Sequence, residues 1–298
     1  MLSTTQYCLK CLICLTLLEQ VTDAFASAEE IPTKGYYAAL STETDDADGR
    51  NLLGEFGLPL GQPGWLHLAV GSSTIKMIDE DVDSTLASIA GGFDTERVSV
   101  EVSYSYREDS DTFEQQDLHG SVTLNGARGS IGLDLFHRSA EDETVTSIER
   151  RRRDPLSIRT TQSVDGTGIG AHMRFDATQA LQLFAAGMTY DYDSDVRGPA
   201  FLDRFPRLAL RISGVSRDQA FLDDTLRGGL TYRFANASIT AQYIRDRELN
   251  TEEVTGSTEI SANIALGNAW AIAPWIGQSS NDTDGDVLYG GLTVSVIW

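Results

Sequence analysis

Nine ionisable side chains occupy polar positions in segments where apolar and polar residues alternate along the chain. They are Glu101, Arg107, Asp117, His119, Asp134, His172, Arg174, Arg227 and Arg233. Their neighbours on the same face are mainly Ser, Thr and Gly. Charged side chains of both signs around a water-filled space set up a field across it and select among ions. We expect these residues to line such a space, with acids on one wall and arginines on another. In a closed interior they would instead form ion-pair networks.

The chain has one dense basic run, residues 149–154, which contains Arg150, Arg151, Arg152 and Arg153. Guanidinium groups donate paired hydrogen bonds to phosphate, so the run fits a phosphate-binding role or a role in attracting anions to an opening. It also fits a solvated run whose charge is balanced by the nearby acids at 141–143.

The sequence contains no recognised catalytic or metal-binding motif. Two His–Ser pairs, His119 with Ser121 and His137 with Ser139, would share a strand face, since residues two apart lie on one side of a strand. Residues 282–286 have part of the spacing of a calcium loop but lack its distal glutamate, which favours an acidic turn. We expect no enzymatic activity, no metal and no cofactor.

The elements that would position these residues are β-strands. Across residues 97–107, valine and tyrosine alternate strictly with polar residues, a period of two that no helix presents. The pattern recurs in residues 118–124, 131–136, 169–175, 184–192, 226–234, 239–243 and 260–266. In the fourth of these segments, the alternation assigns Phe184, Ala186, Met188, Tyr190 and Tyr192 to the apolar, outward face.

Short and long links between these segments alternate. The short links are 94–95, 125–129, 176–179, 235–236 and 267–269, and the long, polar links are 108–115, 139–164, 193–223, 250–255 and 279–285. The pattern predicts about fourteen strands, although twelve or sixteen also fit. Residues 207–215 resemble a strand but break the alternation, so we interpret them as structure within a long external loop.

Composition limits the kind of protein further. The net charge is −21 and the pI about 4.4, which argues against nucleic acid and anionic lipid headgroups as direct partners. Beyond the N-terminus, no segment reaches the roughly 18 unbroken apolar residues of a membrane-spanning helix. Residues 1–26 resemble a secretory signal peptide that ends at Ala24-Phe25-Ala26, and they hold every cysteine in the chain. A short leader (27–33) and one β domain (34–298) would follow.

The last ten residues form a strand pattern that ends on an aromatic side chain. Leu292, Val294, Val296 and Trp298 fall on one face, and residues 291, 293, 295 and 297 on the other. With the alternating strands and links, this ending resembles the closing strand of bacterial outer-membrane β-barrel proteins. The resemblance covers nearly the whole mature chain by pattern, and its specific part is the C-terminal segment, with Val294, Val296 and Trp298 as the assembly signal.

This resemblance implies an all-β protein, an up-and-down antiparallel transmembrane barrel in the outer membrane of a Gram-negative bacterium. Its function would be porin-like: passive diffusion of small hydrated solutes or ions. Its partners would be the barrel-assembly machinery, outer-membrane lipid, and lipopolysaccharide, whose phosphates the basic run would meet. A barrel of about fourteen strands encloses more space than side chains fill, which favours an open lumen. The sequence gives no indication of the solute or of the oligomeric state.

Two other functions fit the same pattern. A plugged structural or adhesive barrel would bind lipid, matrix or another cell without conducting. An outer-membrane lipid hydrolase would use one of the His–Ser pairs. We favour the channel over both.

Overall fold

A computed structural model describes residues 35–45, 49–61, 63–76, 81–109, 113–150, 153–193, 222–248, 254–281 and 285–298. The expected signal peptide, the leader and the segment 207–215 lie outside these ranges. In the described part of the chain, no helix is long and apolar enough to cross a membrane.

Within these ranges the chain forms fourteen β-strands, which confirms the predicted fold class and strand number. They are β1 (Tyr37–Asp45), β2 (Arg50–Pro59), β3 (Gly64–Lys76), β4 (Asp81–Asp94), β5 (Val98–Asp109), β6 (Phe113–Gly126), β7 (Gly129–Arg150), β8 (Arg153–Asp176), β9 (Leu181–Tyr192), β10 (Leu222–Arg233), β11 (Ala237–Glu248), β12 (Val254–Leu266), β13 (Trp270–Asn281) and β14 (Gly285–Ile297).

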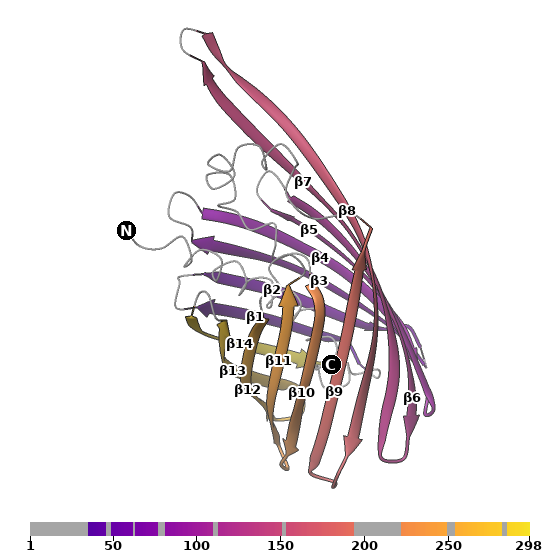
Figure 1. The fold of residues 1–298 in the computed structure, drawn as a ribbon. Coiled ribbons are helices and arrows are strands. Elements are labelled where there is room, and N and C mark those ends of the chain that lie inside the picture. The colour runs from indigo at the N-terminus through magenta and orange to yellow at the C-terminus, as the bar shows by residue number, and fades with distance from the viewer. Residues whose placement is uncertain are drawn as a thin grey trace.

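The strands close into a barrel in sequence order, each antiparallel to its neighbours (Figure 1). β1 pairs with β14 from Tyr37 opposite Ile297 to Asp45 opposite Tyr289. Just beyond this ladder, the backbone N–H of Tyr36 donates to the carbonyl of Trp298 at 3.0 Å, and the N–H of Trp298 donates back at 3.1 Å. The C-terminal residue therefore completes the seam that closes the sheet.

The two ends of the barrel differ. One end, here termed the termini end, holds the start of β1, the end of β14 and the turns that follow β2, β4, β6, β8, β10 and β12. The opposite end, termed the loop end, holds the β7–β8 hairpin, the end of β9 and the start of β10.

The turns at the termini end are tight because single residues close them. Thr95 accepts a hydrogen bond from the N–H of Val98 on its Oγ1 at 2.9 Å, and Thr178 does the same for Leu181 at 2.9 Å. Gly267, between β12 and β13, has a φ of +80°, a conformation that glycine adopts without steric cost.

The predicted long link at 139–164 is wrong. β7 runs to Arg150 and β8 starts at Arg153, so most of this segment is a paired ribbon that rises beyond its neighbours (Figure 1). The sequence 143–148 (ETVTSI) is rich in β-branched residues, which favour strands even where the segment is polar. The links expected at 108–115 and 279–285 are also shorter, because β5, β6, β13 and β14 extend into them.

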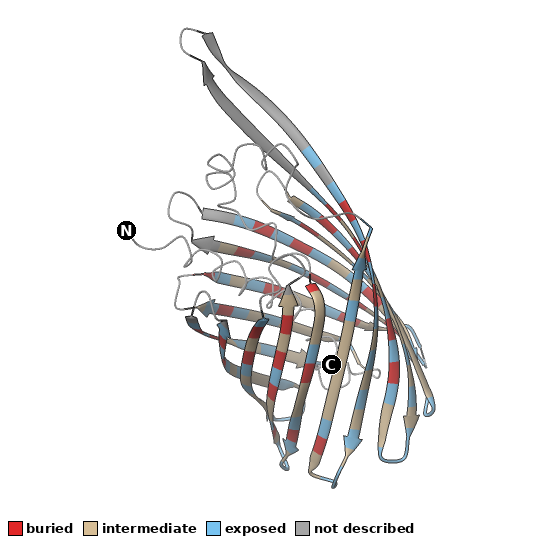
Figure 2. Ribbon diagram, viewed as in Figure 1, coloured by how far each residue is buried: buried red, intermediate tan, exposed pale blue. Residues whose placement is uncertain are grey.

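The two faces of the barrel wall differ in chemistry. Large apolar side chains on the outer face are exposed, among them Val70 and Leu133 at 65% each and Leu135 at 64%. The intervening residues face the interior and are mostly buried or half-buried, so that the two classes alternate along the strands (Figure 2). This is the arrangement of a barrel that is surrounded by lipid and has a polar interior.

The predicted orientation of β9 is wrong. Arg174 on β8 lies opposite Phe184, and His172 lies opposite Ala186. Cross-strand partners share a face, so these β9 residues point inward with Met188, Tyr190 and Tyr192. The outward positions 183–189 hold Leu, Ala, Gly and Thr, so neither face of β9 is charged there and alternation alone could not tell inside from outside.

Replacing Leu133 by arginine should separate the lipid-facing wall from a soluble one. Leu133 lies between Ile131 and Leu135, at the middle of the exposed apolar stretch of β7, and an arginine near the bilayer midplane costs about 2–4 kcal/mol of folding free energy. Leu266→Arg, at the last residue of β12, is the matched control and should cost about 1 kcal/mol or less. Urea titration of protein refolded into lipid vesicles measures both, and equal losses would contradict a lipid boundary at Leu133.

Candidate functional site

The inner wall of the barrel holds the candidate functional residues. The structure places all nine of the ionisable side chains that the sequence singled out on this face. It brings some of them into direct contact and leaves others apart, as the following clusters show.

An Asp–His cluster joins β6, β7 and β8. The carboxylate of Asp134 lies 3.3 Å from Nε2 of His119 and 2.8 Å from Nδ1 of His172. The second ring nitrogen of His172, Nε2, lies 2.9 Å from Oγ1 of Thr123. Gly132 makes room for this ring, since a Cβ there would lie 2.2 Å from His172 Nε2. The cluster thus ties three strands together, although its members are far apart in sequence.

The chain Thr123–His172–Asp134 has the order of a nucleophile, base and orienting acid. Acyl transfer also needs donors aimed at an oxyanion, usually free backbone N–H groups. Thr123 lies inside two ladders, opposite Ser99 and Gly132. Because both ring nitrogens of His172 are occupied and the surrounding backbone is laddered, the geometry favours a structural tie.

A second cluster couples a buried ion pair to an aromatic ring. Arg138 donates from Nε to Asp117 at 2.8 Å and from Nη2 at 3.0 Å, and Gln115 donates to the same carboxylate at 2.7 Å. The guanidinium of Arg138 lies 5.1 Å from the ring centroid of Phe136, within cation–π range. Arg138 was not among the nine candidates, but its alternation with Asp134 and Phe136 in β7 could have indicated it.

The remaining arginines differ in their partners. Arg107 binds Asp109 through Nε at 3.1 Å and lies over the ring of Phe113. Arg227 donates from Nε to Gln242 at 2.9 Å and lies 5.8 Å from the ring of Phe184.

Arg233 and Arg174 are less tightly held. Arg233 reaches Asp176 at 3.7 Å, and both side chains are more than a third exposed. Arg174 makes no hydrogen bond or ion pair with any residue in the described part of the chain, and it is half-buried on the inner face. Its guanidinium is thus available to a solute.

Charge is distributed unevenly around the inner wall. In the described ranges, the inner-face arginines are Arg107, Arg138, Arg174, Arg227 and Arg233, all between β5 and β10. The inner-face carboxylates are more numerous: Glu43, Asp45, Glu55, Asp94, Glu101, Asp109, Asp117, Asp134, Asp176, Asp246 and Glu259. On the arc from β11 through β14 and β1 to β4, the described inner residues include acids and no arginine or lysine. One wall is therefore mixed in charge and the other is acidic.

A row of apolar side chains runs along the inner face of β9. Its members, together with a neighbour on β7, are termed here the aromatic lane: Phe136, Phe184, Met188, Tyr190 and Tyr192. Phe136 meets Tyr190 edge-on with ring centroids 5.5 Å apart, and the rings of Tyr190 and Tyr192 are nearly parallel at 6.5 Å. Sequence reasoning missed this lane because it assigned these β9 residues to the lipid.

The lane lies against three alternate glycines of β8, Gly166, Gly168 and Gly170, which are together termed the glycine furrow. A Cβ at Gly166 would lie 2.4 Å from the ring of Tyr192, one at Gly168 would lie 2.9 Å from Tyr190, and one at Gly170 would lie 3.1 Å from Met188. The alternate glycines of β8 therefore let the side chains of β9 lie flat on the wall. The sequence GTGIG at 166–170 is the signal that could have revealed it.

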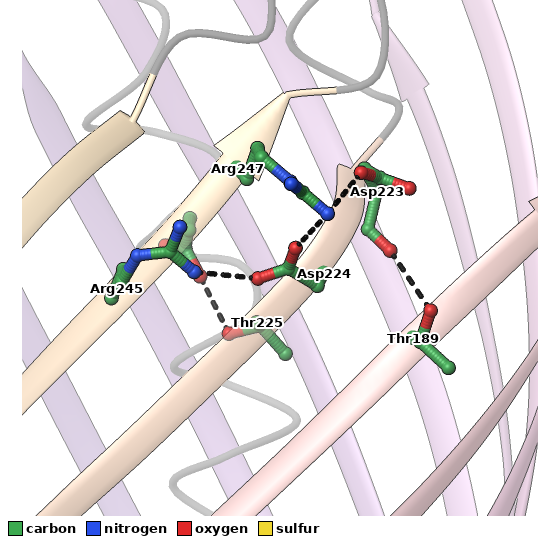
Figure 3. Close-up of polar contacts among 7 residues, drawn as sticks. Thr189, Asp223, Asp224, Thr225, Arg245 and Arg247 are labelled. Atoms are coloured by element: carbon green, nitrogen blue, oxygen red, sulfur yellow. Dashed lines mark hydrogen bonds and ion pairs between the residues drawn. The ribbon is translucent and has the colours of Figure 1, made fainter.

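The outer face carries a charged cluster at the loop end of β10 and β11 (Figure 3). Arg245 contacts Asp224 at 2.7 Å, and Arg247 contacts both Asp223 and Asp224. A register shift between Leu222 and Asp224 allows the two adjacent acids to reach one guanidinium. Leu226, two positions below Asp224, is 53% exposed. The cluster therefore marks where the apolar outer band of these strands ends, on the side of the loop end.

The two predicted His–Ser pairs lie on opposite faces of the barrel wall, one pair on the outer face and the other on the inner face. His137 and Ser139 lie on the outer face, and His137 makes no hydrogen bond or ion pair with another described residue. His119 lies on the inner face with Ser121, where it contacts Asp134. Neither pair forms a hydrogen-bonded catalytic chain within the described residues.

Arg150 and Arg153, the first and last arginines of the basic run, are the final pair of the β7–β8 ladder. Arg151 and Arg152 lie outside the described residues. At the other end of the barrel, the ring of Trp298 stacks on Tyr36 at 6.0 Å and contacts Phe56 at 6.4 Å. Val294 and Val296 lie opposite Leu40 and Ala38 of β1.

No protein-family model and no curated protein matches this sequence. Among solved structures, the chain is similar to the CymD monoaromatic hydrocarbon channel, with 8% identity over 88% of this chain and 87% of that chain and a TM-score of 0.53. It also matches the translocator domain of autotransporter NalP from Neisseria meningitidis, with 11% identity, 95% coverage of each chain and a TM-score of 0.46. The KdgM porin in complex with disordered oligogalacturonate follows, with 9% identity, 88% and 99% coverage and a TM-score of 0.43. The fold is that of an outer-membrane β-barrel.

Proposed function

We propose that this chain is an outer-membrane channel through which small hydrated solutes and ions diffuse passively. The observation that carries the proposal is the excess of carboxylates over arginines on the inner wall. Carboxylates outnumber arginines there, one arc is acidic only, and Arg174 has no partner in the described part of the chain. A barrel of fourteen strands encloses more space than its side chains fill, so the inner-face charges that are only half-buried, such as Glu101 and Arg174, face water.

The direction of the chain in the membrane follows from its two ends. Outer-membrane barrels keep short turns on the periplasmic side and longer loops outside. The termini end then faces the periplasm, and the loop end with the β7–β8 hairpin faces the exterior. In this orientation the arginines at 150–153 lie on the side where lipopolysaccharide phosphates occur.

The likeness to CymD is consistent with a channel, since that protein is described as a channel for monoaromatic hydrocarbons. The proposal includes no enzymatic step, metal or cofactor for the described residues. Insertion would depend on the barrel-assembly machinery acting on the strand that ends in Val294, Val296 and Trp298.

Planar-bilayer recording tests the channel directly. Refolded protein should give stable single-channel currents in KCl, and under a tenfold salt gradient the reversal potential should have the sign of cation preference, because inner-face carboxylates exceed arginines. Glu101→Gln should lower the ratio of potassium to chloride permeability, since Glu101 is a half-buried inner residue on β5. Arg245→Gln, on the outer face, is the control and should leave the ratio unchanged.

One outcome would contradict the channel, and another would contradict its cation preference. Absence of any stable current from correctly folded protein would favour a plugged barrel that binds without conducting. Anion preference would show that the arginines, and not the carboxylates, control the lumen.

A further inference from the structure

We propose that the aromatic lane and Arg174 together form a binding path for small solutes that carry a planar ring and a carboxylate. The inference rests on the proposed channel and names the class of solute that its lumen would retain. It is carried by three observations: the partial exposure of the lane, its glycine furrow and the position of Arg174.

The lane differs from the other rings on the inner wall in its length and in the arginine beside it. Trp65 over Gly92 and Tyr289 over Gly277 are only 5% and 3% exposed and therefore serve as packing. Tyr37 over Gly57 and Trp275 over Gly291 are half-buried, but they lie on the acidic arc, whose described inner residues include no arginine. Every member of the lane is half-buried, so part of each side chain remains open to the interior. Rings that lie flat against glycine backbone offer a surface on which another ring can stack.

The lane also spans much of the barrel wall. Tyr192 lies at the loop end of β9, and Phe184 lies near the termini end, three residues after the strand begins. At about 3.3 Å per residue, the lane extends roughly 25 Å along the strand. A ring could therefore move along it from one contact to the next and remain on an apolar surface.

Arg174 supplies a positive charge for a solute carboxylate, at the end of the lane nearest the termini end of the barrel. It lies directly opposite Phe184 on the same face, and such pairs have Cβ atoms about 5 Å apart. The guanidinium of Arg227 lies on the same ring at 5.8 Å, but its Nε and Nη2 already donate to Gln242. Arg174 is therefore the group that can present a free fork to a carboxylate whose ring rests on Phe184.

The size and shape of this pair indicate an aromatic monocarboxylate of about the size of benzoate. An aliphatic acid would reach Arg174 but would gain nothing from the ring faces. A neutral aromatic would use the lane but not the arginine. The two parts of the site can thus be tested separately.

Blockade of single-channel current provides the test. With the potassium current as the baseline, benzoate, cyclohexanecarboxylate and acetate are added in turn at equal concentration. Benzoate should dwell about 2- to 10-fold longer than cyclohexanecarboxylate, which has the same charge and similar size but no aromatic face. Acetate should give no resolved events.

Substitutions show which residues cause the longer dwell time of benzoate. Tyr190→Leu should reduce the difference between benzoate and cyclohexanecarboxylate, and Tyr190→Phe, which keeps the ring, should preserve it. Arg174→Gln should shorten both dwell times by a similar factor, whereas Arg245→Gln on the outer face should alter neither. Phe136→Leu replaces Tyr190→Leu as the ring deletion if the latter does not fold.

The failure of this inference can be told from failure of the channel. A stable potassium current with equal dwell times for benzoate and cyclohexanecarboxylate overturns the lane and leaves the channel intact. The same holds if the difference survives removal of the Tyr190 or Phe136 ring. Absence of the potassium current itself would refute the channel first.

Discussion

Deletion of Trp298 should lower the equilibrium constant for folding into the membrane on the order of 100-fold, and with it the fraction of folded, inserted barrel. The residue exchanges two backbone hydrogen bonds with Tyr36 and packs its ring on Tyr36 and Phe56, so it holds the seam between the first and last strands. Two hydrogen bonds at about 1 kcal/mol each and two ring contacts at about 0.5 kcal/mol or more sum to roughly 3 kcal/mol, or about a factor of 100. Heat-modifiable migration on gels measures the folded fraction in membranes.

The chain offers a matched control for this deletion. Trp270 is an outer-face tryptophan at the same end of the barrel, 54% exposed, and it lies opposite Val296 within a ladder instead of at the seam. Trp270→Ala should therefore have a much smaller effect. Refolding both variants into lipid vesicles without cellular factors separates seam stability from recognition by the assembly machinery. Normal insertion of the Trp298 deletion in cells would contradict a role in closure.

Asp117→Ala should destabilise the barrel by about 3 kcal/mol or more. The carboxylate accepts two hydrogen bonds from Arg138 and one from Gln115, and the two charged side chains are only 5% and 10% exposed. Removing one partner of a buried ion pair leaves a charge without its counterion, which typically costs about 3–5 kcal/mol. Urea unfolding in vesicles, followed by tryptophan fluorescence, gives the free energy of unfolding.

The outer-face ion pairs give the comparison. Asp224→Ala removes a carboxylate that also contacts two arginines, but its partners Arg245 and Arg247 are 34% and 42% exposed, so the loss should be about 1 kcal/mol or less. The double variant Asp117→Leu with Arg138→Met should regain most of the stability lost in Asp117→Ala, since no buried charge remains. Equal losses in Asp117→Ala and Asp224→Ala would show that the interior pair is as well solvated as the surface one.

The sequence was sufficient for most of the strands and their number, because period-two alternation is a local property of the chain. The closed architecture followed instead from the resemblance carried by the C-terminal strand. It was insufficient for the orientation of β9, since both of its faces lack charge between residues 183 and 189. Only the pairing of Phe184 with Arg174 determines which face points inward, and that pairing is a property of two strands together.

The contacts within the candidate site also depend on strand pairing, which the sequence pattern does not give. Alternation assigned Asp134, His119 and His172 to one face, but it could not show that a single carboxylate contacts both rings. Thr123 and His172 are 49 residues apart, and their contact depends on the register of three strands. Polarity also misled the assignment of 139–164, where Thr, Val and Ile extend two strands that a count of charges would end.

The tall β7–β8 ribbon makes the entrance of the barrel lopsided. β6 leaves β7 at Asp142, and β7 continues to Arg150, so the wall on this side stands about 25 Å higher, measured along the strand. A large partner such as an antibody that approached from the side of the ribbon would meet this raised wall first. Ions and small metabolites, which need no such clearance, would pass from any direction.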